Sequence, residues 1–120
     1  MQPINDFMTA AVISVNAETT VEEAAKLMTE KNISSILVKK GDDYAGIITK
    51  MDLVKKIIVE GRDPKTTPSG TIMSQPLITK DQYVQRSEAN EFMLRKKIKH
   101  LAVTQGKKVV GVLTLSDMVS

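Results

Sequence analysis

The sequence predicts an α+β fold of two βαββα units, each a small three-stranded sheet with two helices, packed as a pseudo-symmetric pair. Three observations support this fold class. The chain of 120 residues repeats itself without a gap at an offset of 65 positions. In each copy, short β-rich runs alternate with segments of helical periodicity. The composition, with 42% hydrophobic and 26% charged residues, is that of an ordinary globular chain.

The repeat sets the expected domain boundaries. The first unit covers residues 1–65 and the second covers residues 66–120, with a Gly-, Pro- and Thr-containing linker at about residues 61–70. A unit of about 60 residues buries only about 60% of its unfolded surface and is marginal alone. We therefore expect the two copies to share an interface, and a ligand cleft to form there.

Each copy opens with a short apolar run, at residues 11–15 and 77–79, that favours a buried strand. A helix follows, because Thr20 and Glu23 have the spacing of a capping box. In the second copy, Arg86 takes the place of Val21. This change weakens the apolar face of the second copy's helix, so we expect Val84 to contribute more of the apolar packing. The apolar face predicted for the first copy's helix consists of Val21, Ala24, Ala25 and Met28.

Two further β-rich runs, residues 35–38 and 44–48, flank the sequence KKGDD and predict a hairpin. A second helix is expected from Met51 to Val59. Its counterpart in the second copy is truncated, because the sequence ends at Ser120, three residues past Asp117. We expect that the protein is longer or that another chain completes this site.

The sequences GIITKMD (46–52) and GVLTLSD (111–117) carry the candidate function. Taken alone, Thr49 and Asp52 are explained by capping, because the hydroxyl and the carboxylate can bond the backbone at the start of a helix. Both copies nevertheless use Thr and Asp behind a Gly. A carboxylate at a helix start can accept hydrogen bonds from ribose hydroxyls, the free N–H groups beside it favour phosphate, and the Gly leaves room for a flat base.

At these residues the chain resembles a tandem pair of cystathionine-β-synthase (CBS) domains, a Bateman module. The resemblance extends over FMT and IMS, VEEAAKLM and RSEANEFM, and ISSILV and IKHLAV. It implies two clefts between the copies that bind adenosine compounds. It places Asp52 and Asp117 on ribose hydroxyls with Thr49 and Thr114 close by. It also places Ser116, and the basic pair Lys99 and His100, near phosphate.

The two copies differ where phosphate contacts are expected. The first copy has Ser34, Ser35 and Met51 where the second has Lys99, His100 and Ser116. Residues 1–65 contain 9 basic and 10 acidic groups and residues 66–120 contain 8 and 4, so the net charges are −1 and +4. An anionic ligand should prefer the second motif, although cations at a helix end are often only solvated. The remaining candidate ligand-binding residues are Ile13, Ser14, Ile78 and Thr79.

Composition excludes several other functions. The chain has no cysteine and one histidine, so we expect no thiolate nucleophile, no metal site of His and Cys, and no enzymatic activity. Without an apolar run near 18 residues or a signal-like start, we expect a cytoplasmic protein with no membrane partner. The expected partners are a regulatory adenosine nucleotide (AMP, ADP or ATP), a second copy of the chain and a regulated enzyme or transporter.

Two alternative functions remain open. The pI of about 9.2 and the run RKKIKH suggest nucleic-acid binding, but the net charge is only +3 and the four aromatic residues are scattered. The other alternative is a dimerisation module with vestigial clefts. Leu53, Val54, Ile57 and Ile58 form an apolar face that favours a homodimer, unless these residues are buried within their own unit.

Overall fold

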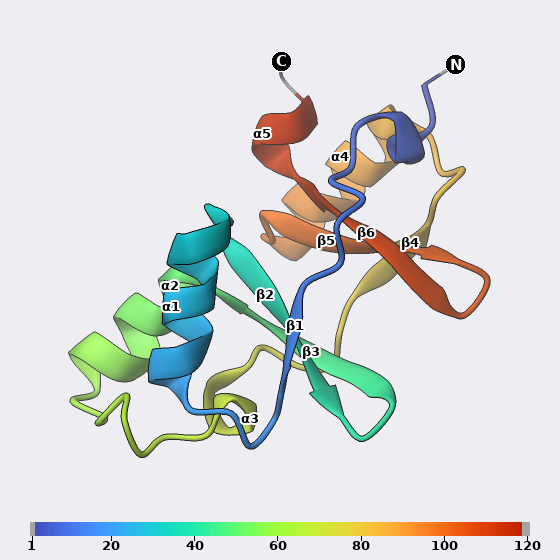
Figure 1. The fold of residues 1–120 in the computed structure, drawn as a ribbon. Helices are drawn as coiled ribbons and strands as arrows, with labels where there is room; N and C mark the ends of the chain where they lie inside the picture. Colours follow the sequence, from blue (N-terminus) through green and yellow to red (C-terminus); the bar gives the residue numbers. More distant parts are fainter. Residues whose placement is uncertain (1, 119–120) are drawn as a thin grey trace. The chain divides into compact units, whose positions relative to one another are not determined.

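The computed structural model describes residues 2–118 and contains two three-stranded sheets with helices (Figure 1). The predicted α+β class is confirmed, and each sheet is built in the same order. A parallel pair joins the first and second strands, and an antiparallel hairpin joins the second and third. The packing divides the chain into residues 13–77 and residues 1–12 with 78–120.

The unit of residues 13–77 follows the predicted βαββα order. Its elements are β1 (Ser14–Asn16), α1 (Val21–Lys31), β2 (Ser35–Lys40), β3 (Asp43–Thr49), α2 (Lys50–Asp52), the π-helix η2 (Leu53–Val59) and α3 (Ser69–Ile72). β1 begins later than the apolar run predicted, because pairing with β2 starts only at Ser14, opposite Leu37. The expected second helix has one α-helical turn and continues as a π-helix.

Local signals explain the ends of α1 and of the hairpin. The Thr20 hydroxyl accepts a hydrogen bond from the Glu23 amide at 3.3 Å, as the capping box predicts. The helix ends at Asn32, whose φ of 54° is left-handed. Gly41 in the β2–β3 loop has a φ of 62°, a conformation that glycine adopts without steric cost.

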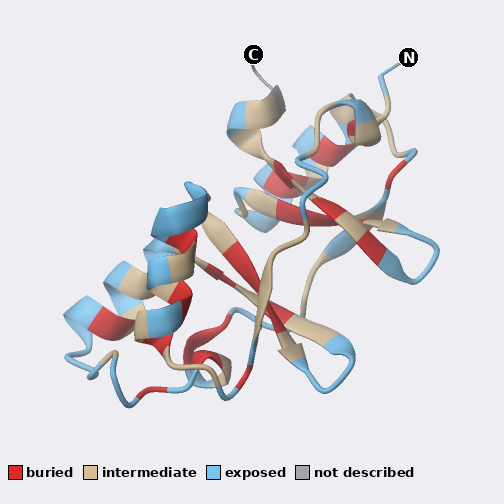
Figure 2. Ribbon diagram, in the orientation of Figure 1, coloured by how far each residue is buried: buried red, intermediate tan, exposed pale blue. Residues whose placement is uncertain are grey.

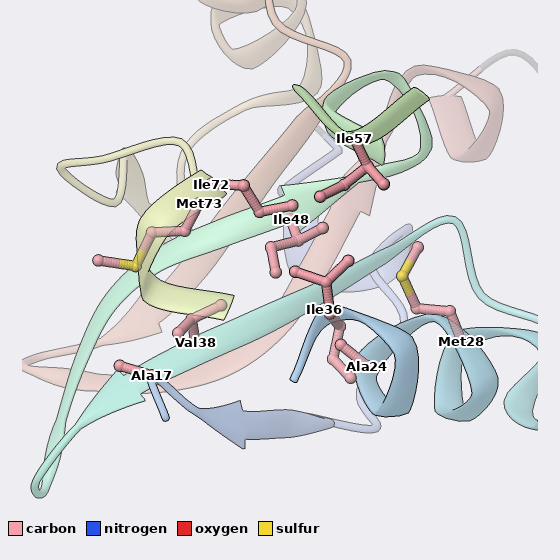
Figure 3. Packing of buried hydrophobic residues seen from close by; sticks show 10 residues of the cluster. Ala17, Ala24, Met28, Ile36, Val38, Ile48, Ile57, Ile72 and Met73 are labelled. Atoms are coloured by element: carbon pink, nitrogen blue, oxygen red, sulfur yellow. The ribbon is translucent and has the colours of Figure 1, made fainter. Parts of the chain in front are cut away.

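The core of this unit lies between α1, the sheet and the chain after the π-helix. Figure 3 shows side chains of α1, β2 and β3 meeting those of η2 and α3. Ala25, predicted on the apolar face of α1, is only half-buried. The buried members of the core are Ala17, Val21, Ala24, Met28, Ile36, Val38, Ile48, Ile57, Ile72 and Met73.

The second unit repeats this plan with a smaller core. Its elements are the short 3-10 helix η1 (Ile4–Asp6), β4 (Thr79–Asp81), α4 (Arg86–Lys96), β5 (His100–Gln105), β6 (Lys108–Thr114) and α5 (Leu115–Met118). As predicted, α4 has a weaker apolar face than α1, with only Ala89 and Met93 buried, and Val84 packs against the core. The predicted end of the truncated helix, residues 119–120, lies outside the described residues.

The packing units are offset from the sequence repeat. Ile4, from the start of the first copy, is fully buried in the core of residues 78–120. The segment expected as a linker is also packed, because Thr67 and Ser69 are buried and the Ser69 hydroxyl donates to the Thr19 carbonyl at 2.7 Å. Each unit is therefore completed by a segment that precedes the other copy's first strand.

Candidate functional site

The first motif forms a capped corner between β3 and α2. The Thr49 amide donates to Asp52 Oδ2 at 2.9 Å, and the Asp52 amide donates to Thr49 Oγ1 at 3.2 Å. The Thr49 hydroxyl also donates to Asp52 Oδ2 at 3.2 Å. The capping explanation of this motif is therefore confirmed.

The other oxygen of Asp52 is bound as well. Ser74 Oγ donates to Asp52 Oδ1 at 3.0 Å, and Lys56 Nζ lies 3.1 Å from the same oxygen. Lys56 Nζ also donates to the Ile72 carbonyl at 2.8 Å. Asp52 is only 7% exposed. Both carboxylate oxygens thus hold the local fold together, and they attach residues 72–74 to the start of the helix.

The second motif forms the same corner between β6 and α5, with more accessible groups. The Thr114 amide donates to Asp117 Oδ2 at 2.9 Å, and the Asp117 amide donates to Thr114 Oγ1 at 3.2 Å. The hydroxyls of Thr114 and Ser116 are 2.9 Å apart. Asp117 is half-buried and Ser116 is exposed. Two hydroxyls and a carboxylate are therefore gathered at one corner.

The motif glycines serve a different purpose from the predicted one. A Cβ on Gly46 would lie 2.6 Å from the Ser74 carbonyl oxygen and 2.8 Å from Met73 Sδ. A Cβ on Gly111 would lie 2.6 Å from Met8 Sδ and 2.7 Å from the Thr9 carbonyl oxygen. The expectation that these glycines leave space for a flat base is wrong, because residues 73–74 fill that space at Gly46 and residues 8–9 fill it at Gly111.

The backbone brings the predicted basic pair to the second motif. The Leu115 amide donates to the Lys99 carbonyl at 3.2 Å, which ties the start of α5 to the start of β5. His100 lies opposite Thr114 in the antiparallel register. Lys99 is exposed and His100 is half-buried. The equivalent residues in the other unit are Ser34 and Ser35. The Lys50 amide donates to the Ser34 carbonyl, and Ser35 lies opposite Thr49, but neither serine carries a charge.

The candidate residues at the starts of β1 and β4 lie beside the central strand of each sheet, opposite the strand that carries the motif. Thr79 pairs with Ala102 on β5, two residues beyond His100. Side chains two residues apart on a strand point to the same face, so Thr79, His100 and Thr114 share one face of the sheet. Ser14 pairs with Leu37 in the same manner, next to Ser35 and Thr49. Ile13 and Ile78 differ from these residues, because each packs against the apolar core of its own unit.

Sequence reasoning missed the groups that hold Asp52. Ser74 and Lys56 carry no motif of their own. The signal for Ser74 lies in the repeat, which aligns FMT with IMS and so preserves a methionine followed by a hydroxyl residue in both copies. The described residues contain no cluster of three or more acidic or His side chains that could hold a metal. None of the described helices has the length and apolar character needed to cross a membrane.

Comparison with known proteins agrees with this architecture. The family model of the CBS domain matches residues 4–59 and again residues 70–120. The CBS domain-containing protein YhcV of Bacillus subtilis is 29% identical over 118 residues, which cover 98% of this chain and 84% of YhcV. The mitochondrial CBS domain-containing protein CBSX3 of Arabidopsis thaliana is 37% identical over 83% of this chain, but the match spans only 51% of CBSX3.

Solved structures show the same similarity. A conserved protein of Pyrococcus horikoshii has a TM-score of 0.92 and 34% identity, over 98% of this chain and 89% of that protein. A hexameric CBS-CP12 protein from bloom-forming cyanobacteria has a TM-score of 0.92 and 29% identity, over 99% of this chain and 70% of that protein.

Proposed function

Because the chain belongs to the CBS domain family and contains that domain twice, it is a regulatory module, and we propose that it senses an adenosine nucleotide. The observation that carries this proposal is the corner at the end of β6. There Lys99 and His100 come next to the hydroxyls of Thr114 and Ser116 and to the Asp117 carboxylate. We propose a regulatory role without catalysis.

The groups at this corner match the parts of a nucleotide. The Asp117 carboxylate can accept hydrogen bonds from the paired hydroxyls of a ribose. The hydroxyls of Thr114 and Ser116 can donate to phosphate oxygens, and the exposed Lys99 ammonium adds an attractive charge. Thr79 and His100 share a sheet face with Thr114, and we propose that they contact the remainder of the ligand.

The other motif is the weaker candidate site. Asp52 Oδ1 already accepts from Ser74 and pairs with Lys56, and Asp52 Oδ2 accepts from Thr49. A ribose at this corner would have to replace one of these contacts. The corner also lacks the cations of the second motif, because Ser34, Ser35 and Met51 occupy those positions. We therefore propose that a phosphorylated ligand binds first at the second motif.

Regulation follows from linkage. A ligand that binds one conformation more tightly than another shifts the equilibrium toward the first, and the shift is transmitted to whatever the module is attached to. Self-association provides one route, since the apolar side chains of Met51, Val54, Ile58 and Val59 are exposed. Figure 2 shows exposed positions along the helical segment that follows β3. We propose that this surface is covered in a homodimer.

A thermal-shift panel tests the proposed ligand. AMP, ADP, ATP, S-adenosylmethionine and NAD are compared with short duplex DNA at moderate salt. A nucleotide at a hundredfold excess over Kd should stabilise the protein by about 2.7 kcal/mol. DNA binding with steep salt dependence and no nucleotide effect would support the nucleic-acid function instead. A protein that responds to no member of the panel would fit a dimerisation module.

A further inference from the structure

Positive charge is concentrated in one of the two packing units. Residues 13–77 contain nine basic and nine acidic side chains, whereas residues 1–12 with 78–120 contain eight basic and five acidic ones. The net charges are therefore 0 and +3. The excess is not spread evenly over the second unit, because three of its cations surround one aromatic ring.

That ring belongs to Phe92 on α4. Lys80 Nζ lies 4.4 Å from the ring centroid, Arg95 Cζ lies 5.7 Å from it and Lys96 Nζ lies 5.9 Å from it. Phe92 and Lys80 are half-buried, whereas Arg95 and Lys96 are exposed. We call these four residues the Phe92 patch.

The three cations of the patch repel one another. Since all three lie within 5.9 Å of the same centroid, no pair can be more than about 12 Å apart. The Debye length at physiological salt is about 8 Å, so the repulsion is only partly screened. Among residues 2–118, Glu91 is the carboxylate that pairs with the patch, at 3.9 Å from Arg95, and both side chains are largely exposed. Neither Lys80 nor Lys96 forms an ion pair with a described carboxylate.

The repeat shows that the fold does not need the positive charges at positions 80 and 95. The residues equivalent to Lys80, Phe92 and Arg95 in the first copy are Val15, Leu27 and Glu30, whereas Lys96 corresponds to Lys31. Val15 and Leu27 pack against the apolar core of their unit. The same strand and helix thus form there with an aliphatic residue in place of Lys80 and an acid in place of Arg95.

Packing alone accounts for part of the patch. A lysine stem can cover an aromatic ring while its ammonium group stays in water, and a cation over the ring face is attracted to it. One such cation would meet this need for a half-buried ring. A second and a third cation add repulsion, which an anion at the surface would relieve.

We propose that the Phe92 patch is a docking surface for an acidic segment of a partner protein. Charge complementarity carries the proposal, because closely spaced carboxylates would neutralise cations that have few partners of their own. A nucleic acid fits less well. The Lys80 ammonium already lies over the ring, so a base cannot stack there, and the span of about 12 Å is short for a phosphate backbone.

Fluorescence anisotropy tests the proposal with a fluorescein-labelled peptide of alternating glutamate and alanine, and with labelled oligothymidylate of equal charge. The variant combines Lys80→Gln with Arg95→Glu. Its control combines Lys40→Gln with Lys65→Glu, two exposed sites in the other unit, and loses the same total charge. Melting curves of both variants report whether the fold is intact.

We expect the peptide to bind the unmodified protein, with an affinity about fivefold to tenfold higher than that for the patch variant. The control variant should weaken peptide binding by less than half as much as the patch variant does. No measurable binding by the unmodified protein, or equal weakening in the two variants, would overturn the proposal. Tighter binding of oligothymidylate that depends on the patch would identify a nucleic acid as the occupant and overturn it as well.

Discussion

Gly46 is a position where one added carbon atom would clash with its neighbours. A Cβ there would meet the Ser74 carbonyl oxygen at 2.6 Å, and backbone cannot move away as a flexible side chain can. We expect Gly46→Ala to lower the free energy of unfolding by about 1 to 3 kcal/mol, measured by urea denaturation. Gly41→Asn is the control, since a Cβ added there would meet nothing within 4 Å beyond its chain neighbours and Asn tolerates the left-handed backbone. Equal stability of the Ala variant and the unmodified protein would show that residues 73–74 are not held against β3.

Substitution of Asp52 should affect stability more than substitution of Asp117 does. Asp52→Ala removes a cap, takes away the acceptor of the Ser74 hydroxyl and leaves Lys56 with the Ile72 carbonyl alone, so we expect a loss of about 1.5 to 3 kcal/mol in the free energy of unfolding. Asp117→Ala should cost about 0.5 to 2 kcal/mol, the range for a lost cap. Asp42→Ala, at an exposed hairpin position, is the control. A larger loss for Asp117→Ala than for Asp52→Ala would contradict this order.

Binding should show the opposite order. For folded protein, we expect Asp117→Ala to weaken AMP about 10- to 150-fold by calorimetry, because hydrogen bonds to a charged group are lost. Asp52→Ala should weaken AMP less. Lys99→Ala should weaken AMP far more than adenosine, which has no phosphate. If Asp52→Ala abolishes AMP binding while the other two variants bind normally, the second motif is not the stronger site.

At the scale of elements, the helix after β3 divides its apolar residues between two roles. Ile57 is buried in the core and Leu53 packs against it, as burial within the unit predicts. Val54 is 44% exposed, Ile58 73% and Val59 74%. The π-helical winding joins residues five positions apart rather than four, so a single stripe of α-helical periodicity does not describe which residues face the core.

The exposed residues lead to a prediction about assembly. We expect Ile58→Glu to disrupt self-association without unfolding the protein, because a charge would be buried at the contact. Sedimentation should change from a dimer to a monomer of 13.2 kDa. Lys55→Glu, an exposed change on the same helix, is the control. A monomer at every concentration of the unmodified protein would refute the dimer, and a sixfold mass would indicate a hexamer instead.

Elements whose signals are local could be predicted from the sequence. The cap at Thr20, the hairpin at Gly41 and the corner at Thr49 and Asp52 depend on neighbours within a few residues, and the structure confirms each of them. The start of β1 depends on distant pairing with β2, so the apolar run placed it too early. The contacts of Asp52 with Ser74 and of Gly46 with Met73 join residues far apart in sequence, and local patterns do not contain them.

At the scale of the whole molecule, the packing units suggest how the chain can be divided. We expect a fragment of residues 13–77 to give a cooperative thermal transition by circular dichroism, because it retains Ile72 and Met73 of its core. A fragment of residues 1–65, which follows the sequence repeat, lacks these side chains and should melt at a lower temperature or without cooperativity. The opposite order of melting temperatures would show that the repeat, not the packing unit, is the unit of stability.

The contact of Met8 with Gly111 also has a consequence for how the two copies can change over time. Because Met8 and Thr9 lie against Gly111 of the second copy's motif, a substitution in one copy has to be compatible with the other copy. Recombination between related chains would therefore preserve these contacts when residues 13–77 are exchanged as one block, with crossovers both between residues 12 and 13 and between residues 77 and 78. A crossover at the end of the repeat, after residue 65, would instead combine Gly46 of one parent with Met73 of another.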